Sequence, residues 1–135
     1  MLRVLDEIPA ANFGVMYDTS HGHMVAVVGA RQHGEKEVVE GGQCGFLDKL
    51  AGRINHIHLI DSDNTCHKDD NGDDETSMHL PFGKGVVDFP PILKKLAAVQ
   101  LSHDWWTVDL CFWPDAWEAT ASCKQAMDAF VAEYT

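Results

Sequence analysis

The sequence predicts an α/β fold built on a parallel sheet. Three short, mainly apolar segments are typical of strands, and they comprise residues 12–17, 54–60 and 105–112. A segment with helical spacing of apolar residues follows each strand, and such alternation favours parallel pairing. Each strand also has a polar or ionisable residue near its carboxyl end, where the sites of parallel α/β proteins collect.

The first strand ends abruptly in polar residues. The apolar run 12–17 is followed by Asp18-Thr19-Ser20-His21, as expected for a buried parallel strand whose carboxyl end opens into a site. Residues 1–10, before this strand, are expected to form the tail of a helix or a connecting loop that Pro9 ends.

The second strand, residues 54–60, carries two histidines on one face. His56 and His58 are two positions apart, and side chains alternate along a strand with period two. Phe46 and Leu50 belong to a short helical stripe before this strand. After it we expect a long acidic loop over residues 61–85, which lacks the alternating spacing of an EF-hand calcium loop.

One predicted helix precedes the third strand in the sequence and another follows it. Asp88 is a candidate N-cap for a helix whose apolar face consists of Ile92, Leu93, Leu96 and Ala97. Asp109 lies within the third strand, and a final helix follows it to the end of the chain. The tryptophans are expected in the core or at the mouth of the sheet, at positions Trp105, Trp106, Trp113 and Trp117. Surface positions are expected for His23, His33, His67 and His103.

Composition excludes several classes of function. Ten Lys and Arg against 21 Asp and Glu give a formal charge of −11, which disfavours nucleic acid and anionic membrane surfaces as partners. No apolar run approaches the roughly 20 residues that span a bilayer. Four scattered cysteines form no C-x-x-C pair, which indicates neither a disulfide framework nor a cysteine zinc site and favours the reducing cytoplasm.

Three segments together carry a resemblance to a family. Asp18–His21, His56–Asp61 and His79–Phe89, in this order, resemble the last third of xylose isomerase-like TIM barrels. That superfamily contains sugar and sugar-phosphate isomerases and epimerases, inosose dehydratases and the endonuclease IV group. The resemblance covers residues 12–133 and implies that residues 1–135 form a single partial domain, the C-terminal portion of a (β/α)8 barrel with about three β/α units.

The resemblance also implies roles for individual residues. Asp18 and His58 match two ligands of the family's divalent metal, and Asp109 stands where the final Glu ligand is expected. His21 resembles a substrate-contacting histidine, so His21 and Asp109 are the candidate catalytic residues. His79 and the following Gly83-Lys84-Gly85 turn resemble a substrate-facing loop. Trp113, as an alternative to packing in the core, is a candidate for stacking on a sugar ring.

The chemistry of these residue types supports a metal site independently of the family resemblance. Two carboxylates and an imidazole suit Mn²⁺, Mg²⁺, Co²⁺ or Zn²⁺, and an open coordination position can hold a sugar carbonyl and hydroxyl. Each residue also has a simpler explanation. Asp18 can cap the turn that follows its strand, and a histidine on a strand is often a hydrogen-bonded core residue.

Two departures from the family pattern concern catalysis. The strand before Asp18 should supply the first Glu ligand, and Glu7 is the only upstream candidate. Asp109 is shorter than the expected Glu by one methylene. A complete barrel needs about 250 residues, so we expect a truncated form, a homo-oligomer or a half that pairs with the missing barrel half.

The leading hypothesis is a metal-dependent isomerase or epimerase that acts on a small sugar, cyclitol or sugar phosphate. A non-catalytic barrel fragment that serves as a binding or assembly module is an alternative from a different class. An endonuclease IV-like phosphodiesterase is the second alternative. Against it, Ser77 stands where that group is expected to offer a metal-binding Asp.

Overall fold

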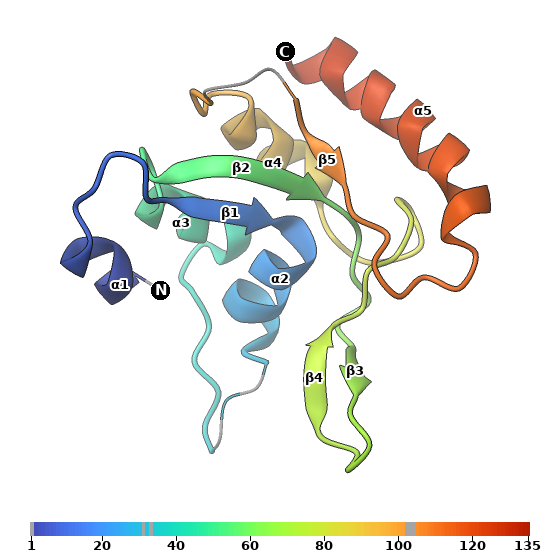
Figure 1. The fold of residues 1–135 in the computed structure, drawn as a ribbon, viewed down its shortest axis with the longest axis horizontal. Coiled ribbons are helices and arrows are strands. Elements are labelled where there is room, and N and C mark those ends of the chain that lie inside the picture. Colours follow the sequence, from blue (N-terminus) through green and yellow to red (C-terminus); the bar gives the residue numbers. More distant parts are fainter. Residues whose placement is uncertain (1, 31, 33, 102–104) are drawn as a thin grey trace.

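The fold is organised around a three-stranded parallel sheet. A computed structural model describes residues 2–30, 32, 34–101 and 105–135. The sheet has the order β1-β2-β5, with β1 at Val15–Asp18, β2 at Ile54–Leu59 and β5 at Thr107–Val108 (Figure 1). The predicted α/β class with a parallel sheet is therefore confirmed. The third strand is shorter than the predicted range 105–112, because only Thr107 and Val108 pair regularly with β2.

Helical segments lie behind, beside and at the ends of the sheet. They are α1 (Leu2–Glu7), α2 (Thr19–His23), the π-helix η1 (Met24–Val28), α3 (Gly42–Lys49), α4 (Phe89–Leu96) and α5 (Ala116–Tyr134). In the view of Figure 1, α3 and α4 lie behind the strands and α5 crosses beside β5. The turn from β1 into α2 and η1 was not predicted from the sequence.

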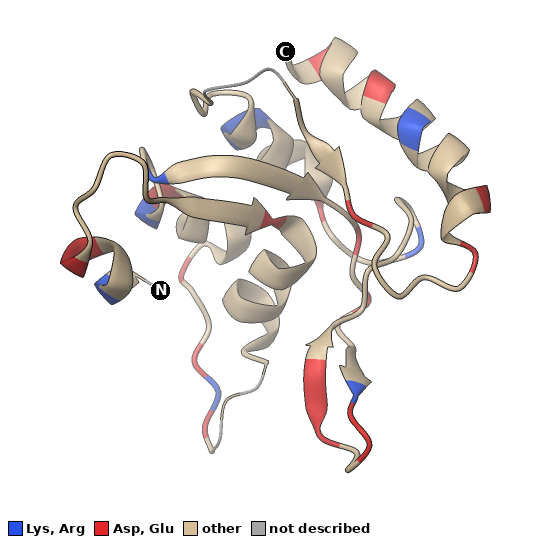
Figure 2. Ribbon diagram, in the orientation of Figure 1, with Lys and Arg blue, Asp and Glu red and all other residues tan. Residues whose placement is uncertain are grey.

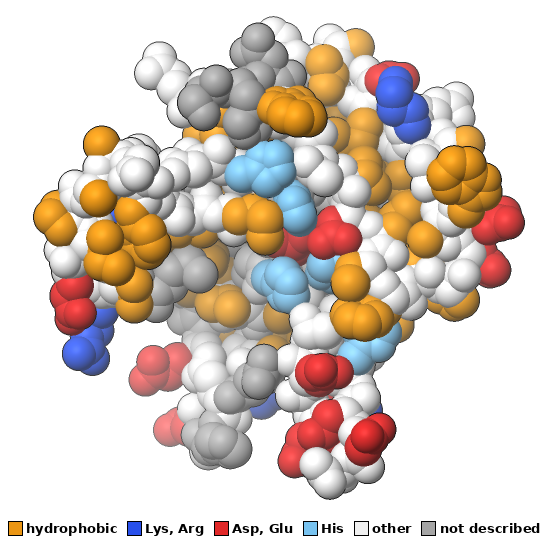
Figure 3. Space-filling model, viewed as in Figure 1, with side chains coloured by type: hydrophobic (Ala, Val, Ile, Leu, Met, Phe, Trp, Pro, Cys, Tyr) orange, Lys and Arg blue, Asp and Glu red, His pale blue; other side chains and the backbone are white. Residues whose placement is uncertain are grey.

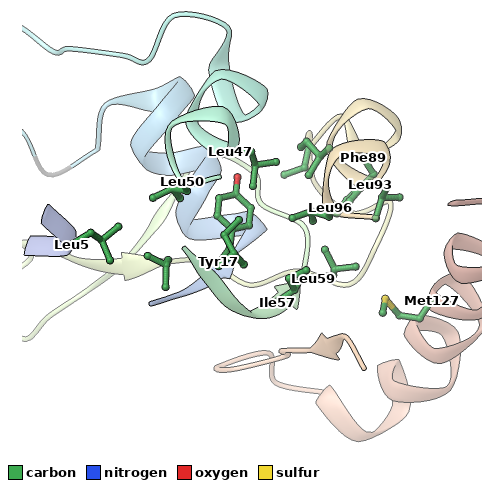
Figure 4. Close-up of a cluster of buried hydrophobic side chains, with 14 residues drawn as sticks. Leu5, Tyr17, Leu47, Leu50, Ile57, Leu59, Phe89, Leu93, Leu96 and Met127 are labelled. Carbon is green, nitrogen blue, oxygen red and sulfur yellow. The ribbon is translucent and has the colours of Figure 1, made fainter. Parts of the chain in front are cut away.

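The core lies between the sheet and helices α3 and α4. Tyr17, Ile57 and Leu59 alternate along their strands so that they point toward these helices (Figure 4). Leu93 and Leu96 are fully buried on α4, consistent with the predicted apolar face of this helix. Each fully buried aliphatic side chain stabilises the fold by about 1.5–3 kcal/mol relative to an exposed one.

The predicted long loop contains a β-hairpin. β3 (Cys66–Lys68) pairs antiparallel with β4 (Asp74–Ser77), and an ion pair joins Lys68 to Asp74. Figure 2 shows acidic residues along this hairpin and its turn. The expectation of a loop was wrong here because both strands are short and polar, without the alternating apolar residues that reveal a strand in sequence.

Several expected positions are corrected by the structure. Trp105 and Trp117 are 67% and 85% exposed, so neither packs in the core. Trp105 precedes an edge strand, and Trp117 lies on the outer side of α5. His23 is buried rather than on the surface, and its Nε2 lies 2.6 Å from Oδ1 of Asn64.

His33 and His103 lie outside the described residues. Among the helices that the structure describes, none combines the length and the apolar character needed to cross a bilayer.

Candidate metal centre

The register of the sheet brings three distant residues to its carboxyl edge. Asp18 ends β1 and lies opposite His58 on β2, and His58 lies opposite Thr107 on β5. Asp109 follows two residues after Thr107, so its side chain belongs to the same face of the sheet as the other two. Parallel strands end at one edge, and these three residues therefore meet although 91 positions separate the first from the last.

Asp18, His58 and Asp109 form one group of candidate ligands. His58 Nδ1 lies 3.8 Å from Asp18 Oδ2 and 3.4 Å from Asp109 Oδ2. One ligand atom from each residue lies within 4.8 Å of the others, which is the spacing that allows a shared metal ion. Their role as metal ligands stays a prediction.

His79 lies against both carboxylates of this group. Its Nδ1 is 3.5 Å from Asp109 Oδ2 and its Nε2 is 4.0 Å from Asp18 Oδ1. The four side chains therefore form a closed ring in which imidazoles and carboxylates alternate. The His79 side chain is only 5% exposed, so its position suits a ligand as well as the substrate contact that the sequence predicts.

His21 is the exposed member of the site. Its main-chain amide donates to Asp18 Oδ1 at 2.9 Å, because Asp18 is the N-cap of α2. Its Nδ1 lies 2.9 Å from Ser77 Oγ at the end of β4. The rings of His21 and His79 are 5.0 Å apart, and these two histidines form a second possible ligand group with Asp18.

Buried polar atoms without partners test whether a metal fits. Asp18 Oδ2, His58 Nδ1 and both ring nitrogens of His79 are buried and have no hydrogen-bond partner among the described residues. Leaving one such group unpaired costs about 1–3 kcal/mol. All four atoms are potential metal ligands and all face the same ring of side chains, so the residues present fit a divalent cation.

Hydroxyl groups tie the segments of the site together. Thr19 Oγ1 donates to the carbonyl of Ile60 at 2.6 Å and accepts the amide of Ile60 at 2.8 Å. Ser20 Oγ donates to the carbonyl of Met78 at 2.9 Å. Sequence reasoning missed these residues and the hydroxyl of Ser77, and the one available signal was the period-two spacing of Ser77 and His79.

Asp109 and the turn after it form the far side of the site. Asp109 Oδ1 accepts a hydrogen bond from the amide of Cys111 at 3.0 Å. The other carboxylate oxygen, Oδ2, points toward His58 and His79. Burial, together with the charge of Asp109, raises the pKa of the Cys111 thiol. Trp113 is half-buried in this turn, and its amide donates to the carbonyl of Leu110.

The site lies on an open face of the molecule. Figure 3 shows histidine side chains around acidic ones near the middle of the face that is turned toward the viewer. On this face β1 also presents Met16, which is 53% exposed and two positions before Asp18. The sheet edges at β1 and β5 have no further strand among the described residues.

Comparison with known proteins supports one family. The family model described as xylose isomerase-like TIM barrel matches residues 1–129. No curated protein and no solved structure matches this chain. The family match covers nearly the whole chain and includes each candidate ligand, so the chain belongs to the xylose isomerase-like TIM barrel family.

Proposed function

We propose that this chain is a divalent-metal-dependent isomerase or epimerase of a small sugar, cyclitol or sugar phosphate. The observation that carries the proposal is the ring of Asp18, His58, Asp109 and His79, whose buried ligand atoms lack partners. Family membership supports a barrel fold, of which this chain would supply about three β/α units at the carboxyl end.

The ligand set suits a hard or borderline divalent ion. Asp18, His58 and Asp109 would hold it, with His79 as a further donor, and imidazole with carboxylate suits Mn²⁺, Co²⁺, Zn²⁺ or Mg²⁺. When bound, such an ion polarises a substrate carbonyl and neutralises the negative charge that develops on its oxygen.

The protein's own groups would then move the proton. Isomerisation or epimerisation removes a proton from the carbon beside a carbonyl and returns one, so no oxidant or other reactant is needed. His21 is exposed beside the ring and Ser77 fixes its Nδ1, so its other ring nitrogen is available to the substrate. Asp109 is the second candidate, because its side chain is 29% exposed and only its Oδ1 is held by a main-chain amide.

Substrate contacts are proposed for residues around this centre. His21 faces the open side, His79 lies deeper in the ring, and Trp113 follows β5 at the same edge of the sheet. Trp113 would stack its indole on the C–H face of a sugar ring.

The open face of the sheet implies a partner. Strands that complete the barrel would cover Met16 and the ligand ring, and we propose that a second copy of the chain or the missing barrel half provides them. The proposed substrate is a small carbohydrate.

Two observations disfavour the endonuclease alternative. Ser77 offers a hydroxyl where a metal-binding carboxylate is expected, and this hydroxyl is bonded to His21. The strand ends at the site and the neighbouring hairpin also carry mainly acidic residues (Figure 2), which would repel a phosphate backbone.

The test compares two histidines on one strand. His58→Ala removes a proposed ligand, while His56→Ala removes a histidine of the same face whose Nε2 lies 3.0 Å from Thr107 Oγ1. Metal-stripped proteins are titrated with Co²⁺ and followed by visible absorption. We expect one ion per site in the wild type and in His56→Ala, and at least about tenfold weaker binding in His58→Ala.

Turnover is measured separately from binding. Candidate aldoses, ketoses and inososes are incubated with the metal-loaded protein in D₂O, and deuterium incorporation beside the carbonyl reports proton transfer. Metal binding without deuterium incorporation would favour the non-catalytic binding module. Equal Co²⁺ affinity in His58→Ala and the wild type would contradict the proposed site.

A further inference from the structure

A second buried carboxylate lies outside the ligand ring. Asp61 follows β2 and is 2% exposed. Its Oδ1 accepts the amides of Ser62 at 2.8 Å and Val87 at 3.1 Å. Its Oδ2 accepts the amides of Gly83 at 3.0 Å and Gly85 at 2.9 Å. Four main-chain amides therefore solvate this anion in place of water.

The loop is shaped to approach Asp61 closely. A Cβ atom at Gly85 would overlap Oδ1 of Asp61 and the carbonyl of Ser62, and Gly83 has a φ of +80°. These two glycines are therefore required where the chain wraps around the carboxylate, which gives the Gly83-Lys84-Gly85 turn a structural role beside the substrate-facing role that the family resemblance implies.

Asp61 is also bonded to the residue that follows His79. Its amide donates to the carbonyl of Leu80 at 3.0 Å, and the amide of Leu80 donates to the carbonyl of Asp61 at 3.1 Å. On the other side of His79, the carbonyl of Met78 accepts the hydroxyl of Ser20 at 2.9 Å. Both main-chain neighbours of His79 are therefore anchored.

The ring of His79 has no such anchor of its own. Neither of its nitrogens has a hydrogen-bond partner among the described residues, although the side chain is almost fully buried. In the absence of an ion, this ring is held against Asp18 and Asp109 by the anchored main chain on both sides of His79 and by its contact with the ring of His21.

We propose that Asp61 is a positioning residue, which holds the segment 80–87 around its carboxylate and thereby fixes His79 in the ligand ring. The consequence for metal affinity rests on the proposed function. The positioning itself does not, because it concerns the metal-free chain.

The first test therefore uses metal-free protein. Diethyl pyrocarbonate modifies accessible histidines, and peptide mass spectrometry gives a rate for each one. In Asp61→Asn an NH₂ group replaces one of the two carboxylate oxygens and faces two main-chain N–H donors, so the loop loses one of its two acceptor atoms. We expect His79 to react at least about tenfold faster than in the wild type, and the rate at His58 to change less than about twofold.

A core variant separates local from global effects. Leu93→Ala removes a fully buried side chain of α4 and lowers overall stability without touching the Asp61 carboxylate. It is expected to leave the ratio of the His79 and His58 rates unchanged. Parallel acceleration of both histidines in Asp61→Asn would overturn the proposal, because it would show a merely structural role.

A second variant covers the case in which Asp61→Asn does not fold. Gly85→Ala keeps the carboxylate and displaces the loop, so the same selective acceleration at His79 is expected. Hydrogen exchange of the wild type needs no variant: slow exchange is expected for the amides of Gly83, Gly85 and Val87. Unprotected exchange at all three would overturn the proposal.

Metal affinity is the last readout. Co²⁺ titration is expected to show about 10–100-fold weaker binding in Asp61→Asn and a change below about threefold in Leu93→Ala. Absence of binding in the wild type would contradict the proposed function alone, since the His79 rates still decide the role of Asp61. Selective acceleration at His79 with unchanged Co²⁺ affinity would refute the link between Asp61 and the ligand ring.

Discussion

At the scale of single residues, Asp18 uses its two carboxylate oxygens differently. Oδ1 accepts the amide of His21 and caps α2, whereas buried Oδ2 has no hydrogen-bond partner among the described residues and lies 3.8 Å from His58 Nδ1. The capping role requires an acceptor, and the proposed metal role requires a negative charge. The two explanations that the sequence left open for Asp18 are therefore compatible, and substitution can separate them.

Asp18→Asn is expected to keep the cap and lose the metal. The amide oxygen can still accept from His21, so the midpoint of thermal unfolding should change little, while Co²⁺ affinity should fall by at least about tenfold. Asp18→Ala removes both functions and should cost about 1 kcal/mol more in the free energy of unfolding. Thermal unfolding and Co²⁺ titration of both variants provide the check, and wild-type affinity in Asp18→Asn would rule out a charged ligand at this position.

Tyr17, next to Asp18, is held neutral by its surroundings. Burial, followed by the charges of Cys44 and Asp18, raises the pKa of Tyr17, and its hydroxyl donates to Gln43 Oε1 at 2.6 Å. Since the pKa is higher in the folded chain, the unfolded chain loses its proton first as pH rises through about 10. The free energy of unfolding contributed by this group is therefore lost progressively above that pH.

Alkaline titration can follow Tyr17 alone. The chain has two tyrosines, so Tyr134→Phe leaves Tyr17 as the single source of tyrosinate absorption. We expect this absorption to appear together with loss of the far-ultraviolet circular dichroism signal, well above pH 10. Tyrosinate formed near pH 10 in a chain with intact circular dichroism would contradict the assigned environment.

At the scale of elements, the hairpin β3–β4 supplies part of the site. Ser77 at the end of β4 holds His21 Nδ1, and the chain that leaves β4 delivers His79. β1 and β2, by contrast, bring Asp18 and His58 together by register alone. The site therefore depends on the hairpin as well as on the sheet.

Ser77→Ala tests this contribution of the hairpin. Without the hydroxyl, the ring of His21 is free to rotate, so turnover should fall about 10–100-fold while Co²⁺ affinity at the Asp18, His58 and Asp109 group stays within about threefold. The matched control is Ser122→Ala on α5, where an exposed hydroxyl bonded to the Ala119 carbonyl is removed far from the site. Equal turnover in Ser77→Ala and the control would argue against a role for His21 orientation.

At the scale of the whole molecule, the open side of the sheet predicts association. β1 and β5 are edge strands, and Met16 and Trp105 are exposed apolar residues near them. Unpaired edges and apolar surface favour pairing with another chain. The formal charge of −11 makes two copies repel each other. Because salt screens this repulsion, the association should become stronger as the salt concentration rises.

Sedimentation velocity over a concentration series measures this association. We expect the wild type to sediment as more than one chain, increasingly so between low and physiological salt, and Met16→Glu to shift the equilibrium toward the single chain. Val38→Glu is the control, because it adds the same charge at an exposed apolar residue outside the sheet. Equal effects of the two substitutions would indicate that charge, and not the edge at β1, governs the equilibrium.

The sequence by itself determined the parallel α/β class and the strands that carry Asp18 and His58. Apolar runs that end in polar residues are local signals, and period-two alternation fixes which side chains share a face. The same reasoning placed Asp109 at the third strand, although Val108 is the last residue that pairs regularly with β2.

Only the tertiary structure decided the rest of the site. Burial of His79 between two carboxylates, the bond from Ser77 to His21 and the four amides around Asp61 all depend on how residues 61–87 fold back onto the sheet. Such contacts join residues through main-chain hydrogen bonds and close packing, which leave no periodic pattern in the sequence. The sequence therefore indicates where the strands end, whereas the three-dimensional course of the segments between the strands determines which side chains meet at those ends.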